Sequence, residues 1–246
     1  MRSKVLVSTA SNGREDYRKA QLALIKSTHN HKLRLTHDYM MRCVDGYCDN
    51  YYGVPITLGS WPVTEKYGVS WQHKDMPYQF KPFAIQEAIE SGYKQVLWCD
   101  STIRLMRNPS HLWDECAEHG ILAWDNEGHP LKQWIAPHAV KTIGIDVDGV
   151  KQIMACCIMF DFNNPKTQVV FDEWIECSRN GAFLNKGFDN HRHDQACLSA
   201  IMHKHGIPIQ PYGALAYPHY TPTAPTFLNV GAVSYTHLTL PTNREV

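Results

Sequence analysis

The segment that most constrains the fold of this chain is a compact apolar run at residues 95–99 (Gln-Val-Leu-Trp-Cys), which Asp100 follows directly. A run of this length and composition is typical of a central strand that is buried on both faces of a sheet. Upstream, residues 80–89 place apolar side chains at helical spacing, Pro82 suits a first turn, and Gly92 suits a helix end. Together these segments predict a helix that leads into a central strand ending at an acid.

The same alternation of apolar strands and helical stripes continues along the chain. Strands are predicted at residues 5–9, 32–36, 120–125 and 153–162, and helices from Tyr17 onward and at residues 110–119, 168–178 and 194–205. Residues 45–59, rich in Gly, Asp, Asn and Tyr, predict a loop. Because strands that alternate with helices pack as a mostly parallel sheet with helices on both faces, we expect an α/β fold.

Length and charge limit the organisation and the partners. A chain of 246 residues is sufficient for one α/β domain. Lys and Arg (24) balance Asp and Glu (24), so no overall field would recruit nucleic acid or an anionic membrane. The eight cysteines include no CxxC pair, and we expect them to be the reduced, buried thiols of a cytoplasmic protein. We expect neither a signal peptide nor a membrane span, because the apolar runs are too short.

The last stretch, residues 233–246 (VSYTHLTLPTNREV), differs from everything before it. It resembles the translated sequencing-adapter tails that end many assembled metagenomic reading frames. The alternative is a genuine polar tail. In either case we exclude it from the fold argument and expect a single domain at residues 1–232.

Acids at strand ends are the first candidates for a functional site. In open parallel sheets, ligands bind beyond the carboxyl ends of the strands, and both Asp100 and Asp125 are predicted at such ends. Asp100 could hold a divalent cation, a ribose or both, since a diphosphate needs its charge neutralised before its sugar can depart. The alternative is that Asp100 only begins a turn through Ser101.

Three segments resemble, in the same order, glycosyltransferases of the GT-A fold. Residues 96–103 (Val-Leu-Trp-Cys-Asp-Ser-Thr-Ile) are similar to the strand that carries their Asp-x-Asp motif, preceded in them too by Lys-Pro-Phe-x-Ile, here residues 81–85. Residues 155–163, with Trp174 downstream, are similar to the strand and helix that carry acceptor and sugar contacts in family 8 and its relatives. His-Asp-Gln at residues 193–195 resembles the Asp-Gln that begins the next helix there.

This resemblance spans residues 78–206 and implies a hexosyltransferase of GT-A (Rossmann-like) architecture that uses a nucleoside-diphosphate sugar, most readily a UDP-sugar. Asp194 and Gln195 would be its catalytic residues, in contact with the sugar hydroxyls or the anomeric face. In an inverting enzyme Asp194 would be the general base, and in a retaining one Gln195 would stabilise the oxocarbenium-like face. The alternative is that Asp194 only stabilises the helix dipole.

The remaining contacts are assigned by position in the same scheme. The acceptor and the transferred sugar would contact Asp125, Trp134, Asn163 and His193, with core filling as the alternative for Trp134. The base, ribose and phosphates of the donor would contact Thr9, Ser11, Arg14, Lys81, Asp100, Ser101, Thr102 and Arg104.

One departure from the resemblance concerns the metal. Where the family usually has a second acid two residues after the first, this chain has Thr102. A C-terminal histidine completes the metal site in the family, and His219 is the candidate by order, with a surface loop histidine as the alternative. Bound Mn²⁺ or Mg²⁺ would thus rest on Asp100 and His219. Without a metal, the diphosphate would need cationic side chains, for which Arg104, Lys81 and Arg14 are available.

The acceptor and the competing functions stay open. A glycan or a lipid-linked sugar is the default acceptor, and a hydroxymethylated DNA base is the alternative if the metagenomic origin is viral. The first competing function is a non-catalytic module that holds a nucleotide or glycan. The second is a zinc-dependent hydrolase, suggested by His191-x-His193-Asp194, although no following histidine completes a zinc site. The oligomeric state is not predicted.

Overall fold

The computed structural model describes residues 3–10, 15–44, 59–60, 63–216 and 225–230. Three of the candidate site residues, Ser11, Arg14 and His219, lie outside these ranges. So do most of the predicted loop at residues 45–59 and the whole of residues 233–246. The architecture and the candidate site below are therefore built from the other residues.

A six-stranded sheet forms the centre, in the order β3-β2-β1-β4-β9-β6. Its first four strands are parallel to one another, whereas β9 runs antiparallel to both of its neighbours, β4 and β6. The strands of this sheet are β1 (Lys4–Ala10), β2 (His37–Cys43), β3 (Gly59–Ser60), β4 (Gln95–Cys99), β6 (Ile121–Leu122) and β9 (Cys157–Asp161). The mostly parallel, mixed sheet that the sequence predicts is confirmed.

Two small sheets extend from this centre. The first pairs β10 (Leu215–Ala216) with β11 (Phe227–Asn229) and β11 with β5 (Ile103–Leu105), which brings a late segment of the chain beside the loop after β4. The second pairs β7 (Asp125–Pro130) with β8 (Lys151–Ile153). The segment from β4 to β5 is thus held on two sides, by β9 and by β11.

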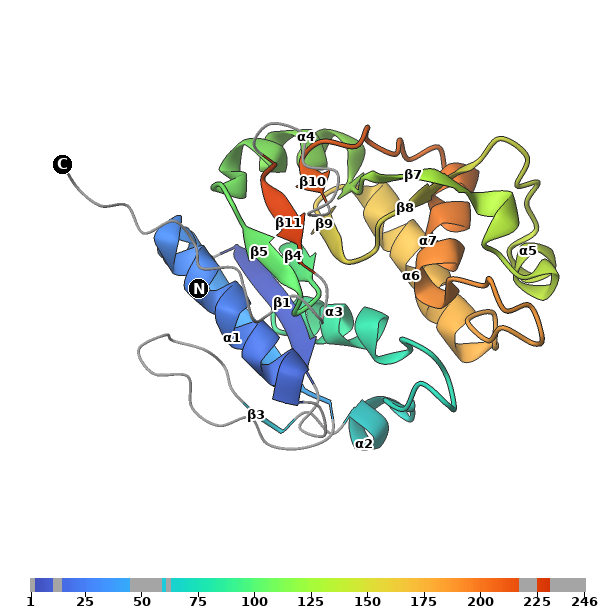
Figure 1. Cartoon of the computed structure of the whole chain (residues 1–246), viewed down its shortest axis with the longest axis horizontal. Coiled ribbons are helices and arrows are strands. Elements are labelled where there is room, and N and C mark those ends of the chain that lie inside the picture. The colour runs from blue at the N-terminus through green and yellow to red at the C-terminus, as the bar shows by residue number, and fades with distance from the viewer. Residues whose placement is uncertain (1–2, 11–14, 45–58, 61–62, 217–224, 231–246) are drawn as a thin grey trace.

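Helices cover both faces of the central sheet (Figure 1). One apolar layer packs beneath α1 (Glu15–Asn30) and α4 (Leu112–His119), and the other beneath α3 (Phe80–Glu90), α5 (Pro137–Ile143), α6 (Pro165–Arg179) and α7 (His193–Lys204). Leu6 belongs to the first layer and Val5 and Val7 to the second, as expected because successive strand side chains point to opposite faces. Shorter helical segments are α2 (Val63–Tyr67), η1 (Leu33–Leu35), η2 (Pro109–His111) and η3 (Leu131–Gln133).

The segments around the site follow the sequence prediction closely. The predicted strand at residues 95–99 is β4, and every residue of it but Gln95 is buried. Pro82 lies in the first turn of α3, and Gly92 follows its end with a φ of 92°. The helix predicted at residues 194–205 is α7. The predictions of these elements are confirmed because each segment combines a strong apolar pattern with a clear signal at its end.

Three predicted strands differ from the observed ones. Residues 32–36 form no strand, because Lys32 takes a left-handed φ of 55° and leads into η1, and the strand is β2 instead. Asp125 does not end a strand but begins β7. The apolar run at residues 153–162 is divided between β8 and β9, because the backbone of Met154 bonds to Trp124 and the Cys156 carbonyl bonds to the Asp100 amide.

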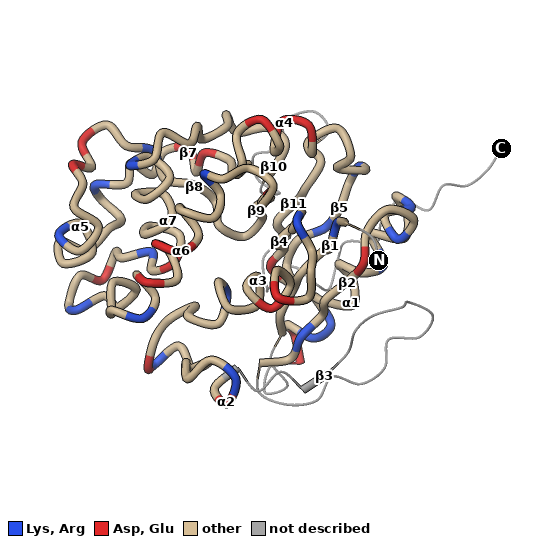
Figure 2. Tube along the Cα trace, turned by 180° about the vertical axis from the view of Figure 1, so that it is seen from behind, with Lys and Arg blue, Asp and Glu red and all other residues tan. Residues whose placement is uncertain are grey.

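The distribution of charged residues over the fold agrees with the balanced composition of the sequence. Acidic and basic positions are interspersed over the described elements (Figure 2). None of the helices that the structure describes is both long and apolar enough to cross a membrane.

Candidate active site

One buried ammonium group connects the predicted site residues. Lys81, in the first turn of α3, is only 2% exposed. Its Nζ lies 2.7 Å from Asp194 Oδ2 and 3.4 Å from Asp100 Oδ1, and it donates a hydrogen bond of 3.1 Å to the Ala155 carbonyl. An ammonium group has three protons, and three oxygens surround this one. Three segments therefore meet at Lys81: the end of β4 with Asp100, the segment before β9 with Ala155, and the start of α7 with Asp194.

The charge of Lys81 is stabilised by its neighbours. Burial alone lowers the pKa of Lys81, but the carboxylates of Asp100 and Asp194 outweigh burial and hold this pKa above its ordinary value. The rings of Tyr78 and Trp98 also flank the ammonium, with centroids 5.3 Å and 5.4 Å from Nζ, at cation–π distance. We conclude that Lys81 is a fixed positive charge inside the site.

The two carboxylates differ in their access to solvent. The side chain of Asp100 is 32% exposed, whereas that of Asp194 is 4% exposed. The Trp98 indole donates a 2.8 Å hydrogen bond to Asp100 Oδ1 and thereby orients the carboxylate. Burial raises the pKa of Asp100, Lys81 opposes this, and repulsion from Asp194 adds to it, so the net shift is upward. Asp100 is thus the carboxylate of the pair that a ligand can reach.

Gln195 binds the segment before β9 through Ala155, the residue whose carbonyl also accepts from Lys81. Its Oε1 accepts a hydrogen bond of 3.3 Å from the Ala155 amide, while the Ala155 carbonyl accepts from Lys81. The structure therefore brings together Lys81 and Asp100, which were predicted as donor contacts, and Asp194 and Gln195, which were predicted as catalytic residues. Ala155 was missed as a contact, because it contributes backbone atoms and its side chain gives no chemical signal.

The other described donor-side candidates lie at the end of β1 or in the segment that follows Asp100. Thr9 lies at the carboxyl end of β1, the strand parallel to β4. Ser101 and Thr102 are buried, and the Thr102 carbonyl accepts a hydrogen bond from Val230. Arg104 is also buried and donates through Nη1 to the carbonyls of Ser101 and Ile103, at 3.0 Å and 2.6 Å. Arg104 therefore holds the turn after β4 in shape.

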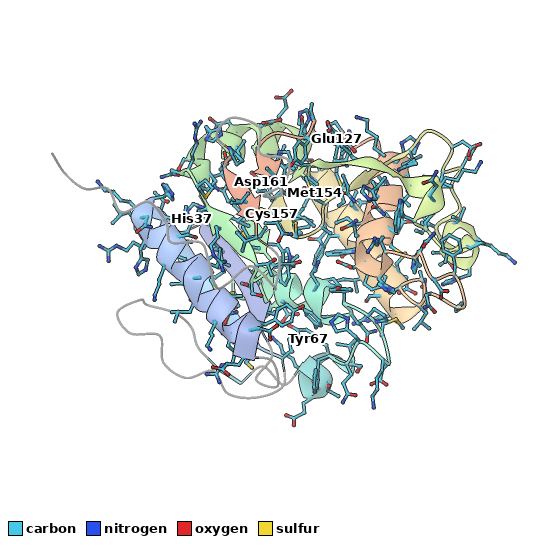
Figure 3. The ribbon with its side chains drawn as sticks, in the orientation of Figure 1. His37, Tyr67, Glu127, Met154, Cys157 and Asp161 are labelled. Carbon is cyan, nitrogen blue, oxygen red and sulfur yellow. The ribbon has the colours of Figure 1, made fainter. Side chains whose placement is uncertain are left out.

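Asn163 is a correction to the predicted site. It follows β9, and this strand runs antiparallel to β4, with Cys99 opposite Cys157 and Gln95 opposite Asp161. The labels of Cys157 and Asp161 mark the two ends of β9 (Figure 3). The amino end of β9, and not its carboxyl end, therefore lies beside Asp100. Asn163 instead donates to Asp161 Oδ1 at the opposite edge of the sheet.

The other three sugar-side candidates have defined environments. Asp125 forms an ion pair of 2.7 Å with Lys151 between β7 and β8. Trp134 lies at the start of α7, where its carbonyl accepts from the Arg192 amide and its ring lies 4.3 Å from the Arg192 guanidinium. His193 directly precedes Asp194. His193 is thus adjacent to the group formed by Lys81, Asp100, Asp194 and Gln195, the Lys81 cluster, whereas Trp134 contacts Arg192 and Asp125 has a structural partner.

In the described part of the chain, no group of three His, Cys, Asp or Glu side chains is placed to hold a metal ion. Thr102 stands where a second acid would be, and Asp100 Oδ1 already has the Trp98 indole and Lys81 as partners. A metal at this place would depend on His219, outside the described residues.

His191 has a structural role that the sequence did not reveal. Its Nδ1 accepts from the Ala136 amide at 3.0 Å, and its Nε2 lies 2.9 Å from the Ala182 carbonyl, to which it can only donate. Both ring nitrogens are therefore occupied, so His191 offers no lone pair to a zinc ion. Burial lowers the pKa of His191 to about 4, although its hydrogen bond to Ala182 opposes this shift.

The pKa of His191 leads to a prediction of acid sensitivity. The folded state holds this ring neutral down to about pH 4, whereas the unfolded state binds a proton near pH 6.5. The stability from the neutral ring is thus present above pH 6.5 and is lost as the pH falls toward 4. We expect His191 to account for a loss of about 2–3 kcal/mol between pH 7 and 4.5. Urea unfolding of the wild type and of His191→Asn measures this loss, and equal losses in both proteins would contradict it.

Comparison with known proteins gives the fold its class. The sequence matches no protein-family model and no curated protein sequence. Among solved structures, galactosyltransferase LgtC in complex with donor and acceptor sugar analogs is 12% identical, with a TM-score of 0.57 over 92% of this chain and 86% of that one. Mouse xyloside xylosyltransferase 1 is 8% identical, with a TM-score of 0.56 over 92% and 97%. The bifunctional glycosyltransferase WbbM is 13% identical, with a TM-score of 0.56 over 93% and 45%.

At these identities the likeness concerns the fold. The chain has the mixed α/β architecture of these glycosyltransferases, and the predicted GT-A architecture is confirmed.

Proposed function

We propose that this protein is a glycosyltransferase that moves a hexose from a nucleoside-diphosphate donor, most readily a UDP-sugar, to an acceptor hydroxyl. The observation that carries the proposal is the Lys81 cluster. Asp100 and Asp194, from distant parts of the chain, share one buried ammonium group at the carboxyl end of β4. Ligands of open α/β sheets bind at this edge, and the fold is one that glycosyltransferases adopt.

The proposed roles follow from exposure and charge. Asp100 is the reachable carboxylate and would bind the ribose of the donor. Asp194 is buried against Lys81, which favours a positioning role and argues against its use as a general base. Gln195 is half-buried beside Asp194 and would contact the transferred sugar. Trp134 and His193 would lie on the acceptor side.

Two further parts of the proposal rest on the sequence. Mn²⁺ or Mg²⁺, if bound, would be held by Asp100 and His219 and would neutralise the departing diphosphate. The roles assigned to the described residues do not depend on that ion. For the acceptor, a glycan or a lipid-linked sugar in the cytoplasm is our first proposal and a hydroxymethylated DNA base the second.

Nucleotide release from a panel of nucleotide sugars, with and without Mn²⁺, tests the function. We expect one donor to release its nucleotide and the addition of a suitable acceptor to accelerate the release. Dependence on Mn²⁺ would support the metal proposal. Silence with every donor, from protein that is folded by circular dichroism, would contradict the enzyme.

A non-catalytic nucleotide-binding module is the second candidate, favoured by Thr102 in place of the second acid. The two candidates differ in one measurement. A module would bind a nucleotide in calorimetry but release none from its sugar, whereas the enzyme would do both.

A further inference from the structure

Two residues beside the Lys81 cluster have a left-handed backbone. In the described part of the chain, four residues other than glycine have a positive φ, and two of them are Tyr78 (57°) and His193 (46°). This conformation is uncommon for side chains with a Cβ, and such strain concentrates at functional sites. The ring of Tyr78 lies over Lys81, and His193 precedes Asp194. The backbone therefore directs both rings at the place where the proposed site lies.

The ring of His193 is fixed through one nitrogen. Nδ1 lies 2.7 Å from the carbonyl of Phe183, a residue of the buried core. A carbonyl oxygen can only accept, so Nδ1 carries the proton, and Nε2 of the neutral ring presents a lone pair. No described residue forms a hydrogen bond with Nε2, and this nitrogen is not among the buried polar atoms without a partner. Nε2 is therefore open to a ligand.

The groups around His193 define what that ligand can be. Tyr78 and His191 lie with ring centroids 6.0 Å and 5.3 Å away, and His73 contacts Tyr78 edge-on at 4.4 Å. The charged groups next to it, Asp194 and Lys81, neutralise each other at 2.7 Å. Burial raises the pKa of Tyr78 to about 12, so its hydroxyl stays neutral. The surroundings are thus mostly aromatic rings, among which Nε2 of His193 presents its lone pair.

The lone pair of Nε2 accepts a hydrogen bond, so its ligand must be a hydrogen-bond donor. The ionised diphosphate of a donor has only acceptor oxygens and would be repelled, whereas a sugar hydroxyl can donate. We propose that neutral His193, through Nε2, accepts the hydrogen bond of the acceptor hydroxyl and so decides whether the sugar goes to an acceptor or to water. This inference rests on the proposed glycosyltransferase function.

His193→Asn tests the inference, because asparagine tolerates a left-handed backbone but offers no lone pair at the place of Nε2. The probes are methyl glycosides of glucose, galactose and mannose. We expect kcat/KM for the acceptor to fall by about 10- to 100-fold, the cost of leaving a hydrogen-bond partner unsatisfied, and donor hydrolysis without acceptor to fall clearly less. The matched control is His203→Asn, an exposed histidine near the other end of α7, which should change neither rate.

One further measurement completes the test. The ¹⁵N shifts of the His193 ring should show the proton on Nδ1, a result that needs no acceptor. A proton on Nε2, or equal loss of transfer and hydrolysis in His193→Asn, would overturn the inference alone. A wild-type protein that releases no nucleotide would overturn the proposed function and this inference with it.

Discussion

Lys81→Met is expected to remove nearly all nucleotide release and much of the stability of the fold. Methionine fills a similar volume, but it leaves the Asp194 carboxylate buried without its partner. Removing one member of a buried ion pair costs about 3–5 kcal/mol. Loss of the charge that orients both carboxylates should lower kcat by about 10³-fold, as for other preorganised electrostatic groups. Urea unfolding and the nucleotide-release assay measure the two effects.

Two other variants separate charge from packing. Lys66→Met removes an exposed lysine that is paired with Glu90 at 2.9 Å, and such a pair contributes about 0–1 kcal/mol. Its activity should stay unchanged. Adding Asp194→Asn to Lys81→Met removes the stranded charge, so stability should partly return while activity does not. A Lys81→Met protein as stable as the wild type would show that the ion pair with Asp194 does not form.

The second large effect is expected for Asp100→Asn, with opposite signs for activity and stability. Nucleotide release should fall by about 10²- to 10³-fold, because the reachable carboxylate of the site is lost. The pKa of Asp100 is raised in the folded state, so the folded protein binds this proton more tightly than the unfolded one. Ionised Asp100 therefore opposes folding at neutral pH, and the amide should make the protein more stable there.

The sign of this effect can be checked by pH. The stability difference between Asp100→Asn and the wild type should be present at pH 7 and should disappear as the pH falls below 3.8, where the carboxyl is protonated in both states. Asn163→Ala, at the opposite edge of the sheet, is the matched control for activity. If Asn163→Ala reduced nucleotide release as strongly as Asp100→Asn, the placement of the site would be wrong.

The elements with a strong local signal could be predicted from the sequence. The strand β4 is an apolar run of strand length, α3 has a stripe with Pro82 and Gly92 at its ends, and α7 follows a polar cluster. Because Asp100 and Asp194 lie at the ends of such elements, they too could be found. A local pattern, however, does not report which element lies next to which.

The differences around the site concern pairing in space, whereas the strand expected at residues 32–36 failed for a local reason, the left-handed backbone of Lys32. The apolar run at residues 153–162 reads the same in either direction, so the antiparallel course of β9 and the removal of Asn163 from the site could not be seen. Lys81 was predicted as a donor contact, and no local pattern shows that its ammonium is buried between two carboxylates. His191 forms hydrogen bonds with Ala136 and Ala182, which lie 55 and 9 residues away in the sequence, and no residue spacing predicts such contacts.

The Lys81 cluster also limits how this protein can change over generations. One ammonium holds the first turn of α3, the end of β4, the segment before β9 and the start of α7. A change at position 81 or 194 alone passes through a poorly folded intermediate, because each leaves a buried charge unpaired. Descendants of this gene should therefore keep both residues or replace both together, while Asp100, whose side chain is 32% exposed, is free to change once its activity is no longer selected.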